Sequence, residues 1–118
     1  MTKKLWQLME EGAAKTKPAK GKFFHTATGE VCACAIGAAI YAVDPKFADP
    51  EQSDWFWAND ILEPYIGFDI YKYDFDQRKP EPLLENSRFG VGVAHAIAHI
   101  NDKHGRDAAI QWVKDKDL

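Results

Sequence analysis

The chain has 118 residues, of which 46% are hydrophobic, and a formal net charge of −3; it includes four Trp, four Tyr and seven Phe. This composition excludes a globally disordered chain, and the length predicts a single globular domain over residues 1–118. The acidic balance argues against a protein that coats DNA or RNA, because such proteins usually carry a basic excess.

The hydropathy pattern argues against a membrane protein or a secreted precursor. The longest apolar run, Val31 to Val43, is shorter than the ~18–20 residues that a membrane-spanning helix needs. Two N-terminal lysines are followed by polar residues rather than by the apolar core of a secretory signal. We therefore expect no membrane partner and a cytoplasmic location.

Cys32 and Cys34 are expected to be reduced thiols, since a bridge between residues two apart would be strained.

The first third of the chain predicts one helix and a hairpin. Apolar residues recur with helical spacing over 4–14, and the lysine-rich segment 15–22 is typical of a solvated loop. Two short β-prone runs, 23–26 and 30–34, flank Ala27-Thr28-Gly29 and predict a β-hairpin.

The segment 35–43 is apolar nearly all round, which is typical of a buried helix. Its small residues Gly37, Ala38 and Ala39 permit neighbouring elements to approach closely. We expect this helix to be the centre of the fold.

The second half predicts three further helices. One begins at Asp49 as N-cap with Pro50 in the first turn and ends at Pro64. Another is capped by Ser87 and ends near His104, before Gly105, and the last spans 107–116. The expected fold is mainly α (α+β): a compact bundle of four to five helices around helix 35–43, with one small β-hairpin at about 23–34.

A possible metal site lies on the penultimate helix. Helical spacing places His95, His99 and Asp102 on one face, and two imidazoles plus a carboxylate are ligands for zinc or another divalent ion. The plainer interpretation is a solvated face, because the apolar stripe Val93, Ile97 and Ile100 lies opposite.

A second candidate is Cys34 as a nucleophile at a helix N-terminus, where the helix dipole favours the thiolate. His95 or His99 would then be the base, and Asn101 or Asp102 would orient it, as in a cysteine-dependent hydrolase. The competing interpretation is an inert thiol in the core, because its neighbours are Ala, Val and Ile. A soft metal site of His25, Cys32 and Cys34 lacks a nearby fourth ligand.

The segment 65–79 alternates aromatic and acidic residues. Exposed rings, of which Tyr71, Tyr73 and Phe75 are the candidates, are typical contacts for a protein partner. The alternative is that these rings cover the core. Neighbouring aspartates disfavour stacking on nucleic acid, since they repel phosphate.

Two short motifs suggest a relationship. The run Cys34-Ala35-Ile36-Gly37-Ala38 and the run Asn101-Asp102-Lys103-His104-Gly105-Arg106 resemble the C-A-I-G-A core and the C-terminal N-D-x-x-G-R segment of a small uncharacterised family from bacteria and their phages. Residues 44–86 are outside the resemblance. It implies a helical corner packed on helix 35–43, with Cys34 as a small core residue, and it implies no activity.

The sequence favours a non-enzymatic cytosolic accessory protein that binds another protein, with no cofactor. The resemblance adds a phage-encoded origin. The two alternatives are the cysteine-dependent hydrolase and the metal-binding protein described above.

Overall fold

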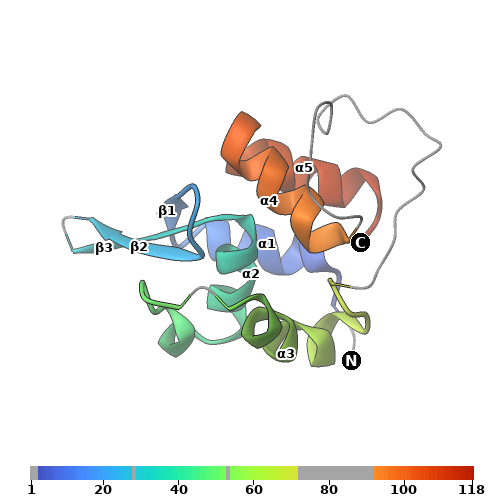
Figure 1. Ribbon diagram of the computed structural model, residues 1–118, viewed down its shortest axis with the longest axis horizontal. Helices are drawn as coiled ribbons and strands as arrows, with labels where there is room; N and C mark the ends of the chain where they lie inside the picture. The colour runs from blue at the N-terminus through green and yellow to red at the C-terminus, as the bar shows by residue number, and fades with distance from the viewer. Residues whose placement is uncertain (1–2, 28, 53, 72–91) are drawn as a thin grey trace.

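The computed structural model describes residues 3–27, 29–52, 54–71 and 92–118 (Figure 1). These residues form five α-helices and a small three-stranded sheet, so the predicted mainly α fold with a small β part is confirmed. The radius of gyration is 13.1 Å, which is typical of one compact domain of this length. In chain order the elements are α1 (Leu5–Ala13), β1 (Lys17–Pro18), β2 (Phe24–Ala27), β3 (Glu30–Ala33), α2 (Ala35–Val43), the 3₁₀ turn η1 (Pro45–Phe47), α3 (Trp55–Ile66), α4 (Val93–His104) and α5 (Arg106–Asp115).

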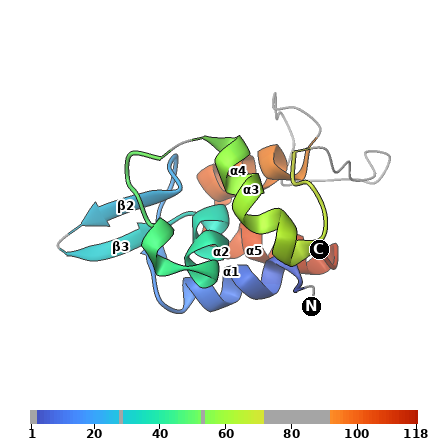
Figure 2. The ribbon, with the colours of Figure 1, turned by 90° about the horizontal axis from the view of Figure 1, so that it is seen from below.

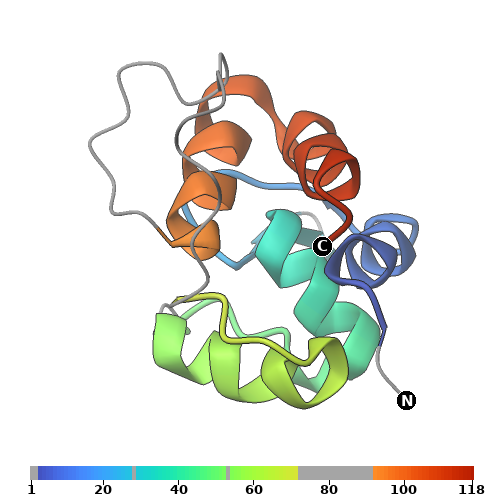
Figure 3. The ribbon, with the colours of Figure 1, turned by 90° about the vertical axis from the view of Figure 1, so that its right-hand side faces the viewer.

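Helix α2 is the centre of the fold, as its sequence predicts. Six consecutive residues, 35–40, are buried, so no face of its first two turns is left to solvent. Helices α1 and α3 lie on opposite sides of α2 (Figure 2), and the α4–α5 pair covers a third side (Figure 3). The small residues of α2 permit close approach: the backbone of Gly12 in α1 lies against Ala38, and the backbone of Phe23 lies against Gly37.

The predicted hairpin is confirmed and projects away from the helices (Figure 1). Strands β2 and β3 pair antiparallel, with Phe24 opposite Ala33, and Gly29 has a positive φ of 79° in the turn between them. The lysine-rich segment 15–22 is not wholly a loop, because Lys17 and Pro18 form β1, parallel to β3. Pro18 is tolerated there because β1 is an edge strand, with the sheet order β1-β3-β2.

Helix α3 differs from its sequence prediction at both ends. Asp49 caps only an isolated turn, in which its Oδ1 accepts from the Glu51 N–H at 3.0 Å. The helix begins later, where Asp54 Oδ1 accepts from the Phe56 N–H at 2.9 Å. Pro64 does not end it; α3 continues to the buried Ile66 and stops at Gly67, whose φ is 79°. The backbone hydrogen bond lost at Pro64 is offset by the burial of the Ile66 side chain in that last turn.

Helices α4 and α5 form the expected corner. Gly105, with a φ of 99°, separates them, as the sequence predicts. Helix α4 begins at Val93, and Ser87, its predicted cap, lies outside the described residues. The C-terminal end returns to α1, where the Leu5 N–H donates to the Leu118 carbonyl oxygen at 2.6 Å.

Candidate functional site

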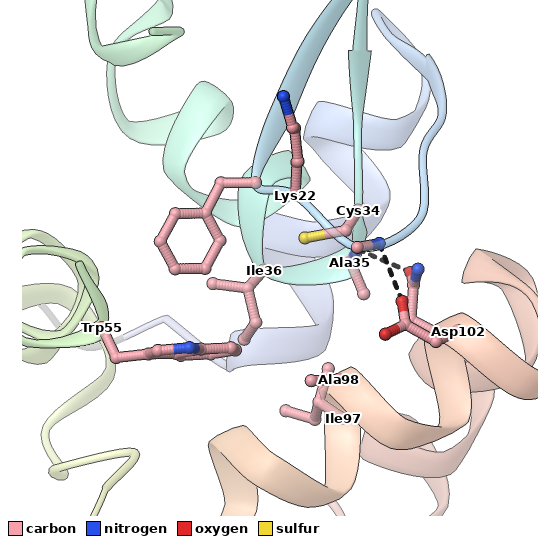
Figure 4. A pocket seen from close by; sticks show the side chains of 11 residues that line it. Lys22, Cys34, Ala35, Ile36, Trp55, Ile97, Ala98 and Asp102 are labelled. Carbon is pink, nitrogen blue, oxygen red and sulfur yellow. Dashed lines mark hydrogen bonds between the residues drawn. The ribbon is translucent and has the colours of Figure 1, made fainter. Parts of the chain in front are cut away.

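A pocket of about 250 Å³ lies where the N-terminus of α2 faces α4 and the first residue of α3 (Figure 4). The Trp55 ring forms one wall, and Ile97 and Ala98 of α4 form another. The remaining lining comes from α2, from the segment before β2 and from the end of α4: Gly21, Lys22, Phe23, Cys34, Ala35, Ile36, Asn101 and Asp102.

Cys34 is the N-cap of α2, so the prediction that it opens a helix is confirmed. Its Sγ accepts a hydrogen bond from the Gly37 N–H at 3.3 Å. Burial raises the pKa of the Cys34 thiol to about 11, which outweighs the opposing effect of the N–H groups of Gly37 and Ile36. The negative charge of Asp102 raises this pKa further. The thiol is therefore protonated at neutral pH, unlike an activated nucleophile.

Asn101 and Asp102 hold the chain around the pocket. Asn101 is 1% exposed; its Oδ1 accepts from the Ala35 N–H at 2.9 Å, and its Nδ2 donates to the Ala19 carbonyl oxygen at 2.8 Å. Asp102 is exposed, and its Oδ1 accepts from the Gly21 N–H at 2.9 Å. These bonds join α4 to α2 and to the segment before β2. Both side chains therefore bond to backbone groups of neighbouring segments, rather than to a histidine that they would orient for catalysis.

The two histidines do not form a solvated face. His99 is 7% exposed, and His95 is half-buried. The His95 ring stacks on Trp55 with centroids 6.1 Å apart and meets Tyr71 edge-on at 5.4 Å. The helical periodicity of α4 misses this burial because α2, α5 and the aromatic side chains cover more than its apolar stripe.

Neither proposed metal site is assembled in the described part of the chain. Within residues 3–27, 29–52, 54–71 and 92–118, no three His, Cys, Asp or Glu side chains gather as a metal ion requires. His95, His99 and Asp102 share a helix without forming such a group. His25 is exposed on β2, opposite the buried Cys32. The sulfur of Cys34 has Gly37 as its hydrogen-bond partner.

Aromatic side chains from α3 and the following turn form a surface beside the pocket. Phe56 is 68% exposed and stacks on Tyr71, with ring centroids 5.0 Å apart and planes 7° from parallel. Tyr71 is itself half-buried and contacts Trp55 and His95. We call Phe56 and Tyr71 the aromatic surface. Tyr73 and Phe75, the other two predicted contacts, lie outside the described residues.

Phe56 is not among the contacts that the sequence analysis predicts, although the predicted helix from Asp49 to Pro64 contains it. The run Trp55-Phe56-Trp57 was the available signal, since successive residues of a helix cannot all face one core. Trp55 and Trp57 both contact Phe23, and Phe56 lies between them on the outer side.

The N-D-x-x-G-R run has a structural role at its last residue as well. Arg106 is 6% exposed, and its guanidinium donates to Thr16 Oγ1 and to the carbonyl oxygens of Ala13, Thr16 and Ala33. Burial lowers the pKa of Arg106 from its usual value. The run therefore joins the α4–α5 corner to α1 and β3.

Across the residues that the structure describes, no helix has the length and apolar character required to cross a membrane. No family model, curated protein or solved structure matches the chain. The resemblance of its two motifs to the bacterial and phage family therefore stays a prediction.

Proposed function

We propose that this protein is a non-enzymatic cytoplasmic binding protein that recognises another protein through the aromatic surface of Phe56 and Tyr71. One observation carries the proposal: Phe56 exposes 68% of its surface while its ring is held parallel to Tyr71. The motif resemblance extends the proposal to an accessory protein encoded by a bacterium or a phage.

The free energy gained by burying the Phe56 side chain favours its use as an anchor for a partner. Burying a Phe side chain fully stabilises a complex by about 1.5–3 kcal/mol, and exposed aromatic residues dominate many interfaces. The stack also limits the entropy lost on binding, because Tyr71 is already fixed by Trp55 and His95. The surface is thus ordered before a partner arrives.

The charges beside the aromatic surface indicate the chemistry of that partner. Asp54 Oδ1 accepts from the Phe56 N–H, and Asp69 Oδ1 accepts from the Tyr71 N–H at 2.8 Å. A carboxylate therefore lies against the backbone of each of these two aromatic residues. This arrangement repels nucleic-acid phosphates and complements an apolar protein segment with basic residues beside it.

The geometry around Cys34 does not favour the hydrolase alternative. A hydrolytic nucleophile requires a base within hydrogen-bond reach and a lowered pKa. In the described residues the hydrogen-bond partner of the thiol is a backbone N–H, and its pKa is raised.

The test compares Phe56→Ala with Tyr65→Ala. Tyr65 is the other exposed aromatic residue of α3, 42% exposed, and nine positions along the helix place it on the opposite face. Proteins are captured from a host lysate by each variant, identified, and their affinities measured with purified components. We expect Phe56→Ala to weaken a specific partner by about tenfold or more, and Tyr65→Ala to leave it unchanged. Equal affinities for both variants and the unmodified protein would contradict the proposal.

A further inference from the structure

Trp55 connects the aromatic surface to the pocket. Its ring forms a wall of the pocket and contacts Tyr71, with centroids 6.5 Å apart and planes 85° from parallel. Phe23 supports the same ring edge-on at 4.9 Å. A protein segment lying on Phe56 and Tyr71 therefore reaches the pocket mouth within the length of a few residues.

The inner part of the pocket offers apolar surface rather than polar partners. The first backbone N–H groups of α2 are already engaged, Ala35 by Asn101 and Gly37 by Cys34. This helix N-terminus is therefore satisfied by the protein itself and has no need of an anion. Figure 4 shows the Trp55 ring extending below Ile36 toward the aliphatic side chains of α4.

The charged groups lie where the pocket opens. Lys22 and Asp102 are both exposed lining residues, one on the segment before β2 and one at the end of α4. A volume of about 250 Å³ lies below the ~300–1,000 Å³ of typical sites for drug-sized ligands, so the pocket has the size for a small group. The pocket suits one ring whose polar attachment stays at the mouth.

We propose that this pocket receives a single aromatic side chain of the protein partner, with the partner's backbone at the mouth beside Lys22 and Asp102. The proposal rests on the proposed function and names the group that anchors the partner next to Phe56. Backbone amide and carbonyl groups are neutral and polar, and they can pair with a cation and an anion at once. The aromatic wall of Trp55 favours a ring over an aliphatic side chain.

Cysteine footprinting tests the pocket in the unmodified protein. Cys34 is modified with methyl methanethiosulfonate at about pH 9, where more of its thiolate forms than at neutral pH, with and without N-acetyl-L-phenylalaninamide. Cys32, which does not line the pocket, is the internal reference. We expect the probe to slow modification of Cys34 about threefold when its concentration is about twice its Kd, with no effect on Cys32. An unchanged rate at Cys34, or equal protection by N-acetyl-L-alaninamide, would overturn the proposal.

The source of the ring is tested with free L-phenylalanine, whose ends are charged. Protection by the blocked amide supports a side chain within a protein. Protection by the free amino acid alone would show a small-molecule site and overturn the protein origin.

A matched pair of variants separates this inference from the proposed function. Ala98→Leu fills the pocket from α4, and Ala108→Leu adds the same atoms at a half-buried site on α5. We expect Ala98→Leu to weaken the Phe56-dependent partner about tenfold and Ala108→Leu to leave it unchanged. A partner that needs Phe56 and tolerates Ala98→Leu would overturn the pocket proposal and leave the proposed function standing. Failure of both Phe56→Ala and Ala98→Leu to weaken any partner would overturn both.

Discussion

Gly12 of α1 lies directly against the backbone of Ala38 in α2. A Cβ atom at Gly12 would lie 1.7 Å from the Ala38 carbonyl oxygen and 2.4 Å from its carbonyl carbon. The two helices therefore meet backbone to backbone, and the position of α1 on the central helix depends on a missing side chain.

Gly12→Ala is expected to destabilise the protein although Ala is the better helix former. Helix propensity favours Ala by about 1 kcal/mol, but the new methyl group meets a backbone oxygen that cannot move alone. We expect the free energy of unfolding in urea to fall by about 1–3 kcal/mol, as in other overpacked cores. Glu11→Ala, at an exposed neighbouring position, is the control and should change it by less than about 0.5 kcal/mol. Unchanged stability of Gly12→Ala would show that α1 and α2 are further apart.

The buried hydroxyl of Thr16 couples α1 to Arg106. It donates to the Gly12 carbonyl oxygen at 2.8 Å and accepts from Arg106 Nη1 at 2.9 Å. Thr16→Val preserves the shape and removes both bonds, so we expect a loss of about 1–3 kcal/mol in unfolding free energy. Thr16→Ser retains the hydroxyl and should lose less. Thermal unfolding of the two variants in parallel measures the difference, and equal stabilities would contradict the coupling.

Asn101 and Asp102 are adjacent yet should differ sharply in their contribution to stability. Asn101→Ala removes one buried and one half-buried hydrogen bond and leaves the Ala35 N–H and the Ala19 carbonyl oxygen without that partner. We expect a loss of about 2–4 kcal/mol, because each buried group left unsatisfied costs about 1–3 kcal/mol. Asp102→Ala removes one exposed bond to Gly21 and should cost about 1 kcal/mol or less. Urea unfolding of both variants checks the order, and a larger loss for Asp102→Ala would reverse our assignment.

The raised pKa of Cys34 predicts how its reactivity depends on pH. Because the pKa is about 11 rather than the ordinary 9.0, little thiolate forms at neutral pH. Alkylation of Cys34 by iodoacetamide in the native protein should be slow at about pH 6 and should continue to accelerate above pH 9.0. Mass spectrometry of the intact protein and its peptides measures the rate. Rapid labelling of Cys34 at about pH 6 would favour the hydrolase after all.

The same shift predicts a loss of stability in alkali. A folded-state pKa above the unfolded value favours folding fully below pH 9.0, and this contribution is lost as the pH rises through about 11. Cys34→Ser keeps a capping side chain on α2 without a group that titrates in this range. We expect the stability of the unmodified protein to fall more steeply over that interval than that of Cys34→Ser, measured by urea unfolding. Parallel curves would contradict the raised pKa of Cys34.

The elements that the sequence predicts well are those whose local signals agree with their surroundings. Helix α2 has the predicted bounds because an all-apolar run can only be buried, and the hairpin register follows from its short turn at Gly29. The sequence prediction for α3 is wrong at both ends. At the N-terminal end, two local capping signals compete. Asp49 with Pro50 resembles a helix start, but Asp54 is the residue that caps α3.

The site depends on contacts between segments that are far apart in the sequence. Local sequence patterns do not predict most of these contacts. Periodicity identified the histidine face of α4 but could not place Trp55 and Tyr71 over His95. The motif that ends in Arg106 was visible in the sequence, although its partners at Thr16 and Ala33 lie far away along the chain. Cys34 was correctly placed at the start of α2, and its position at a pocket wall emerges only when α3 and α4 are assembled around it.

The return of the C-terminal segment to α1 constrains the order of events during synthesis. Leu118 accepts from the Leu5 N–H, Lys114 pairs with Glu10 at 3.2 Å, and Arg106 engages the end of α1. During synthesis α1 can pack on α2 early, but its contacts with α5 form only after residues 106–118 have followed it. A nascent chain arrested before this point leaves uncovered the side of α1 that faces α5, and such transiently exposed surface is a target for chaperones and for aggregation. The contact between α1 and residues 106–118 is therefore a late step in the folding of the nascent chain.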